Sequence, residues 1–228
     1  MIRDGNIEGI PHTVSDVKAF YDIWGPPIER LRGTMTNKKV GSDTNFDAGL
    51  LEQRKVQVMI ADTMYWMRRW YLASIMKPLN LMVVVPTGAT EEMQARAVQA
   101  HINLLENRGF LVRMVVVDPE RALAALRGKI PGVHIDVLGA GDKMLEVDIH
   151  IRRLKEMCRS TLCGLQYTLL RTRVDDLVMY AVNRKNIRRT KGLNDNVCPR
   201  VKFTGRKINY KLDFSVSFGD YCEVKSFR

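Results

Sequence analysis

The sequence predicts an α/β fold in which a mixed five-stranded sheet is covered by helices. Three strand-like segments come first, at 55–62, 70–76 and 81–85, and their short connections are typical of antiparallel neighbours. Two further strand-like segments, 111–117 and 134–137, alternate with helical segments. Because strands that alternate with helices usually pair in parallel, we expect both kinds of pairing in one sheet.

Two long helices are predicted from the spacing of apolar residues. The first begins at Glu91, is capped by Thr90 and reaches Gly109. The second runs from about 145 to 170. Its apolar residues recur at helical spacing and form a core face: Val147, Ile151, Leu154, Cys158 and Leu162.

The 228 residues are enough for one sizeable domain with extensions. We predict an N-terminal extension with a short helix and a basic arm over 1–50, a core over 51–183 and a basic C-terminal extension over 184–228. No apolar run is long enough to span a membrane, and the N-terminus lacks the pattern of a signal peptide. We therefore expect an intracellular protein.

The net charge of +11 is concentrated near the C-terminus. Residues 184–228 hold twelve Lys or Arg against four Asp or Glu, which is +8 of the +11. This excess favours an anionic partner, usually nucleic acid, while an acidic membrane surface and a merely soluble basic tail are the alternatives. Candidate phosphate contacts in this segment are Arg188, Arg189 and Lys191.

Three aspartates are candidates for an acidic site. Asp62 and Asp118 end two predicted strands, and Asp148 lies near the start of the second long helix. Converging carboxylates repel one another unless a cation neutralises them, and oxygen ligands favour Mg²⁺ or Mn²⁺. Two such ions about 4 Å apart can activate a hydroxyl and stabilise the leaving oxygen of a phosphodiester. The alternative is that each aspartate is simply a turn residue.

A row of charged residues follows the third aspartate along the same helix. Arg152, Lys155 and Arg159 repeat at helical spacing from Asp148, on the side turned away from the predicted core face. Such a row is suited to a polyanionic substrate. Near the first aspartate, Trp66 and Trp70 are suited either to stacking on bases or to core packing. The cysteines and histidines lack zinc-ligand spacing, so no zinc site is expected.

Five stretches, in order, resemble the integrase part of copia-like retrotransposon polyproteins. VMIAD, VVVDPERALAAL and GAGDKMLEVDIHIRRLKEMCRS are similar to the segments that carry the three catalytic acids. GPPIERLRGTMTNKK and FTGRKINYKLDFSVSFGDYCEV resemble the segments before and after the core. The resemblance covers roughly residues 20–224, which is nearly the whole chain.

The resemblance implies a ribonuclease-H-like fold, two divalent metal ions and strand transfer of retroelement DNA, a process called DNA integration. By position, Asp62, Asp118 and Asp148 match the catalytic, metal-binding acids of the family. It also implies a nuclear location, DNA as the partner and action as a homo-oligomer.

The chain departs from the family pattern at the third acid, which is normally glutamate. Asp148 is one methylene shorter, and a displacement near 1 Å can lower a rate about a hundredfold. Glu146 is a poor substitute, because two residues along a helix turn a side chain by about 200°. The family's N-terminal zinc module is absent, and Pro119 replaces the usual glycine.

These departures indicate a fragment, a decayed copy or a co-opted gene of a transposable element, and they leave enzymatic activity open. The first hypothesis is an integrase core that binds DNA and retains at most weak metal-dependent chemistry. The second is a non-enzymatic nucleic-acid-binding domain on the same fold. The third is a non-functional relic.

Overall fold

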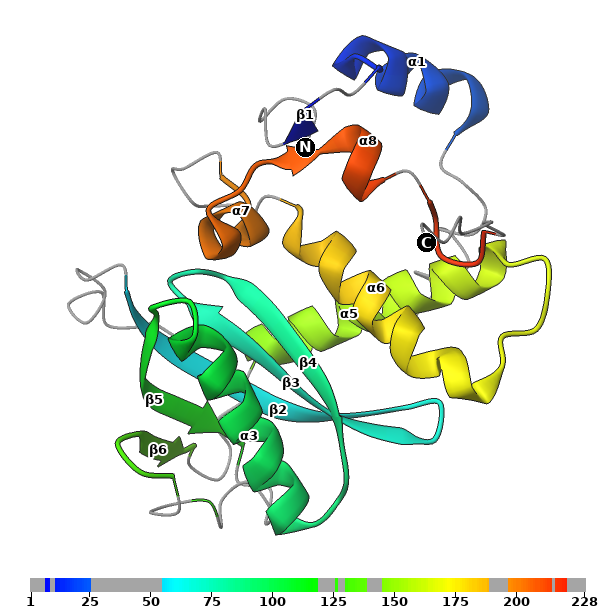
Figure 1. Ribbon diagram of the computed structural model, residues 1–228. Helices are drawn as coiled ribbons and strands as arrows, with labels where there is room; N and C mark the ends of the chain where they lie inside the picture. Colours follow the sequence, from blue (N-terminus) through cyan, green and yellow to red (C-terminus); the bar gives the residue numbers. More distant parts are fainter. Residues whose placement is uncertain are drawn as a thin grey trace, which may run out of the picture. The chain divides into compact units, whose positions relative to one another are not determined.

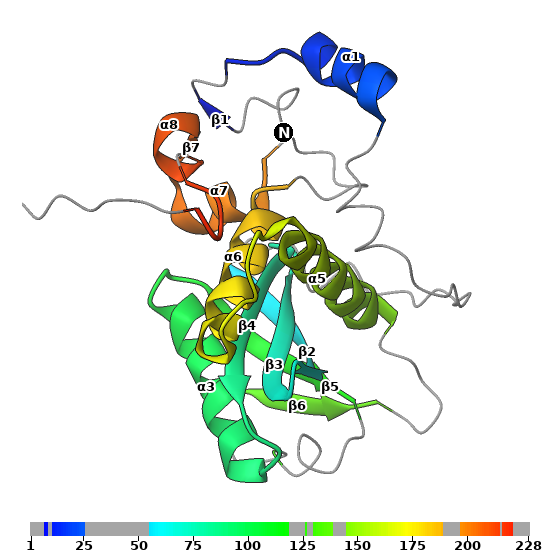
Figure 2. The same cartoon turned by 90° about the vertical axis from the view of Figure 1, so that its right-hand side faces the viewer.

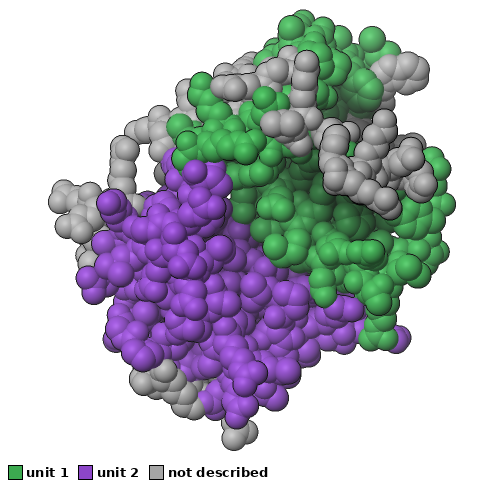
Figure 3. Space-filling view, viewed as in Figure 1, with its two compact units in different colours: residues 1–35, 156–201, 205–228 green, residues 36–155, 202–204 purple. Residues whose placement is uncertain are grey.

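The structure of the chain is a computed structural model. It describes residues 7–8, 11–25, 55–118, 126, 130–138, 145–188, 197–214 and 216–220. The chain divides into two compact units (Figure 3). Unit 1 comprises 1–35, 156–201 and 205–228, and unit 2 comprises 36–155 and 202–204. The domain boundaries predicted at 50/51 and 183/184 stay predictions.

Unit 2 is built on a five-stranded mixed sheet with the strand order β4-β3-β2-β5-β6 (Figure 1). Its strands are β2 (Val56–Trp66), β3 (Arg69–Lys77), β4 (Leu81–Thr87), β5 (Leu111–Val117) and β6 (His134–Val137). Strands β2, β3 and β4 pair antiparallel, whereas β5 pairs parallel with both β2 and β6. This order confirms the predicted α/β class and the predicted mixed sheet, in which three antiparallel strands are followed by two parallel ones.

One face of the sheet is covered by α3 (Glu91–Glu106). Thr90 caps this helix, since its side chain accepts a hydrogen bond from the backbone N–H of Met93, and two acids occupy the first turn. The apolar side of α3 and the facing strand residues form a buried cluster that includes Met59, Ala61, Leu72, Met76, Val98, Ile102, Leu105, Val115 and Val117. The predicted helix and its position between β4 and β5 are therefore confirmed, but the helix ends at Glu106 with Asn107 as its C-cap, before the predicted Gly109.

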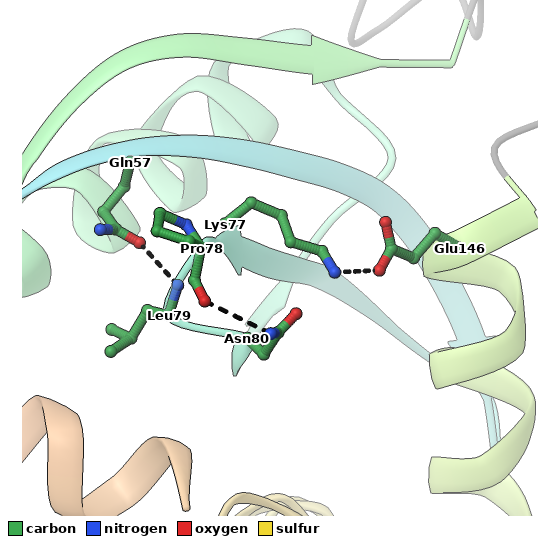
Figure 4. Close-up of polar contacts among 6 residues, drawn as sticks. All are labelled: Gln57, Lys77, Pro78, Leu79, Asn80 and Glu146. Atoms are coloured by element: carbon green, nitrogen blue, oxygen red, sulfur yellow. Dashed lines mark hydrogen bonds and ion pairs between the residues drawn. The ribbon is translucent and has the colours of Figure 1, made fainter. Parts of the chain in front are cut away.

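The opposite face of the sheet carries the first turns of α5 (Leu145–Gly164), as Figure 2 shows. Side chains alternate along β3, so Lys77 lies on the face away from Met76 and the α3 cluster. The Lys77 ammonium pairs with Glu146 in the first turn of α5 (Figure 4). Four of the five residues of the predicted core face are buried, namely Val147, Ile151, Leu154 and Cys158. The helix ends at Gly164, earlier than the predicted residue 170.

The turn between β3 and β4 is fixed by side chains from the sheet (Figure 4). Gln57 of β2 accepts a hydrogen bond from the backbone N–H of Leu79 at 3.2 Å. The Asn80 side chain donates to the carbonyl oxygen of Pro78 at 3.3 Å. Gln57 and Asn80 are both buried, so these bonds satisfy the Gln57 side-chain oxygen and the Asn80 side-chain nitrogen, while Oδ1 of Asn80 has no hydrogen-bond partner among the described residues.

Unit 1 contains mainly helices. Its elements are β1 (Ile7–Glu8), α1 (Val14–Trp24), the second half of α5, η2 (Arg171–Arg173), α6 (Val174–Asn186), the start of α7 (Pro199–Thr204), β7 (Ile208–Asn209) and α8 (Tyr210–Asp213). Strands β1 and β7 pair in parallel. A small core of Ile187, Cys198 and Ile208 lies beneath α7 and α8, and Arg184 of α6 lies over the Phe214 ring at 4.2 Å. Among the described helices, none combines the length and the apolar character that a membrane span needs.

Candidate functional site

Asp62 and Asp118 lie next to each other on neighbouring strands. The last pair in the parallel ladder between β2 and β5 is Ala61 with Val117, and each aspartate is the next residue along the chain, Asp62 within β2 and Asp118 directly after the end of β5. Ala61 and Val117 belong to the cluster under α3, so alternation turns both aspartates toward the opposite face. Neighbouring strands are about 4.8 Å apart. Both carboxylates thus start from adjacent positions on the face that carries α5.

The prediction that a strand ends on Asp62 is wrong. Strand β2 continues to Trp66, because residues 62–66 still pair with β3. What ends at this point is the pairing with β5, whose last residue is Val117. Asp62 is partly buried, and its Oδ1 accepts a hydrogen bond from the backbone N–H of Thr63 at 2.6 Å.

Asp148 lies in the first turn of α5 and interacts electrostatically with Asp118. The pKa of Asp148 is raised above its ordinary value, first because neighbouring atoms remove part of its water shell and second because the Asp118 carboxylate repels its charge. The side chain is nevertheless solvent-exposed overall, so the loss of water is incomplete. Asp118 and Asp148 are therefore close enough for the charge of Asp118 to affect the pKa of Asp148.

The three aspartates do not form a metal-binding cluster in this structure. Within the described ranges, no group of three or more His, Cys, Asp or Glu side chains is placed to hold a metal ion. Of the three, Asp118 and Asp148 interact, since the Asp118 charge raises the pKa of Asp148. As placed here, the three carboxylates do not form the ligand group that a two-ion site needs, so no catalytic step follows from their arrangement.

Glu146 does not replace the third acid. It pairs with Lys77 of β3 (Figure 4). Asp148, two residues later, lies near Asp118 at the end of β5. The two acids therefore point to different sides of α5, as the 200° rotation predicts.

The predicted basic residues are distributed over both units. Arg152 is exposed on α5, and Lys155, one turn further on, is partly buried. Both belong to unit 2, together with the three aspartates, whereas Arg159 and Arg188 belong to unit 1. Arg159 is partly buried and Arg188 is exposed after α6. The two other candidates, Arg189 and Lys191, lie outside the described residues.

Two features of the structure were not predicted from the sequence. Lys77 holds the first turn of α5, and the buried Ser74 hydroxyl oxygen lies 2.7 Å from Nδ1 of His101. Ser74 and His101 are 27 residues apart, and Lys77 and Glu146 are further apart still, so neither contact has a local sequence signal. Both follow from the register of the sheet and the position of its covering helices.

No family model matches the chain, and no curated protein matches it significantly. Among solved structures, the chain is similar to the catalytic core domain of BIV integrase, with a TM-score of 0.48 and 15% sequence identity. The match covers 65% of this chain and 93% of that chain. We assign no residue role from this likeness.

Proposed function

We propose that this chain is an integrase-like nucleic-acid-binding domain, related to the copia-like integrases that its motifs resemble. The observation that carries the proposal is the first half of α5. There, Asp148 lies in the field of Asp118, and Arg152 is exposed one turn further along the same helix. A phosphate backbone would bind to the cation while its reacting groups face the acids.

The charge of the molecule supports nucleic acid as the partner. The chain carries 36 Lys or Arg against 25 Asp or Glu. Such an excess attracts a polyanion before any specific contact forms. We propose Arg152 and Lys155 as phosphate contacts in unit 2, and Arg159, Arg188, Arg189 and Lys191 as contacts in the rest of the chain. For such a domain we also propose DNA as the physiological partner, a nuclear location and a homo-oligomeric state.

A second candidate function is metal-dependent DNA strand transfer, and the register of β2 and β5 favours it. Asp62 and Asp118 occupy adjacent strand positions on one face, as two shared metal ligands would require. In this proposal Asp62, Asp118 and Asp148 are the catalytic and metal-binding residues, and Mg²⁺ or Mn²⁺ is the cofactor. We rank it second because the described side chains form no three-ligand group.

The binding proposal is tested by the salt dependence of duplex DNA affinity. The logarithm of the affinity should fall linearly with the logarithm of the salt concentration, and Arg152→Ala should reduce the slope by about 0.9 for one lost phosphate contact. Arg96→Ala is the matched control, because Arg96 is an exposed arginine of α3 on the other face of the sheet. A salt-independent affinity, or equal effects of the two substitutions, would contradict the proposal.

The catalytic candidate is tested by a strand-transfer and nicking assay with Mn²⁺. Asp148→Glu restores the longer side chain and should raise any activity of the parent chain, while Asp118→Asn should abolish it. If neither the parent chain nor Asp148→Glu cleaves or joins DNA, the chain is not an enzyme of this class. Duplex binding without activity would leave the binding function in place.

A further inference from the structure

The end of the hairpin formed by β2 and β3 carries an unusual set of side chains. Residues 65–70, here called the hairpin tip, read Tyr-Trp-Met-Arg-Arg-Trp. Trp66 pairs with Arg69, so the loop consists of Met67 and Arg68 alone. Their φ angles of 47° and 62° are those of a type I′ turn, which usually contains Asn and Gly. The requirements of the turn therefore do not explain the residues that occupy it.

Three of the six side chains of the hairpin tip are exposed to solvent, and the other three, Trp66, Arg69 and Trp70, are partly buried. Tyr65 is 51% exposed and Met67 is 41% exposed, while Arg68 is also exposed. Tyr65 and Trp70 face each other across the strands, with ring centroids 4.8 Å apart and ring planes inclined by 50°. The tip thus offers aromatic surfaces next to a cation.

The tip has aromatic side chains on both faces of the sheet. Residues 62, 64 and 66 of β2 point to the same side, so Trp66 lies on the face of Asp62, whereas Tyr65 and its cross-strand partner Trp70 lie on the face of α3. Between Asp62 and Trp66, Met64 and its cross-strand partner Tyr71 are buried. In Figure 1 this hairpin extends past the end of β5, whose pairing with β2 stops at Ala61.

We propose that the hairpin tip binds unpaired bases of a nucleic acid strand by stacking, with Arg68 on the phosphates. Aromatic rings accept any base, and a neighbouring arginine supplies the complementary charge. This inference rests on the proposed nucleic-acid-binding function and adds a preference for single-stranded segments.

Intrinsic fluorescence gives a direct test, because the chain has only three tryptophans, Trp24, Trp66 and Trp70. In a Trp24→Phe background, both remaining tryptophans are in the hairpin tip. We expect a short oligo(dT) to quench their emission as it binds. We also expect Tyr65→Leu to lower the affinity for oligo(dT) about tenfold, within the range known for the loss of one base-stacking contact, and to change the affinity for blunt duplex DNA much less.

The matched control is Tyr167→Leu, because Tyr167 is 53% exposed and lies in unit 1. Arg68→Glu, at an exposed turn position, repeats the test without removing an aromatic ring, and a thermal unfolding curve for each variant verifies that it folds. Equal losses for Tyr65→Leu and Tyr167→Leu, or oligo(dT) binding without quenching, would overturn this inference while leaving duplex binding intact. Absence of binding to either DNA would overturn the proposed function as well. Quenching or a blue shift with phosphatidylserine vesicles but not with oligo(dT) would assign the tip to membranes and overturn the inference.

Discussion

The two faces of the sheet in unit 2 differ in how far their ionisable side chains are buried. On the face covered by α3, Ser74 and His101 are both fully buried and lie 2.7 Å apart. Burial lowers the pKa of His101 to about 3, so the ring stays neutral. On the face that carries α5, Asp148 keeps contact with water and with the charge of Asp118. On the first face, His101 is therefore neutral and part of the packed core. On the second face, the Asp148 carboxylate is accessible to a ligand.

The difference has a simple geometric origin. Alternation along β2 and β3 sends polar residues to both faces, and α3 packs on its face against β3, β4 and β5. On the other face, Asp62 and Asp118 come after the last residue pair of the β2–β5 ladder, where the sheet narrows. We therefore expect a titratable residue in the middle of the sheet to affect stability, and one beyond the ladder to affect ligand binding.

The largest expected effect is the dependence of stability on pH through His101. Its pKa is about 3 in the folded chain against 6.5 when exposed, so the unfolded chain binds a proton that the folded chain does not. Stability is therefore full above pH 6.5 and falls as the pH drops toward 3, by about 1.4 kcal/mol per pH unit. Denaturant unfolding of the parent chain and of His101→Gln across this window should show a flatter profile for the variant.

Ser74→Ala separates burial from hydrogen bonding as the cause. Because burial alone lowers the pKa of His101, Ser74→Ala should reduce stability at every pH and leave the slope unchanged. If Ser74→Ala flattens the profile as much as His101→Gln does, the hydrogen bond and not burial keeps the ring neutral. The face covered by α3 would then be more accessible to water than the burial of its residues indicates.

A smaller effect is expected at the hairpin tip, which projects beyond the β2–β5 ladder. Met67 and Arg68 both have positive φ, which is unfavourable for side chains of their size. The double substitution Met67→Asn and Arg68→Gly supplies the residues that a type I′ turn prefers and should stabilise unit 2 by about 1 kcal/mol. Thermal unfolding measures the change, and Arg68→Lys, which keeps the left-handed strain, should leave stability nearly unaltered. A destabilised double variant would mean that the tip side chains contribute packing that outweighs the strain.

The sequence was sufficient to predict the sheet but not the geometry of the acidic site. Apolar runs such as those of β4 and β5 identify strands, and their order with α3 and α5 leaves few topologies. The end of β2 was misplaced, because Asp62 resembles a strand terminus and the pairing of residues 63–66 depends on β3. Likewise, the neighbourhood of Asp118 and Asp148 depends on where α5 packs, which Lys77 and Glu146 help to fix. Such contacts depend on tertiary register, for which single residues give no signal.

The smallest expected effect, and the most direct probe of the open face, is the response of Asp148 to its neighbours. Its pKa is raised first by partial burial and second by the Asp118 charge, so Asp118→Asn should lower the Asp148 pKa without returning it to the ordinary value. Carbon-13 NMR titration of the side-chain carboxyl measures this shift for one residue. Asp62→Asn is the matched comparison, because Asp62 is an aspartate on the same face, whereas Asp118 is the neighbour whose charge raises the Asp148 pKa. Equal responses to the two substitutions would mean that the charges of Asp62 and Asp118 both act on Asp148. A metal site formed by Asp62, Asp118 and Asp148 would then be better supported than binding alone.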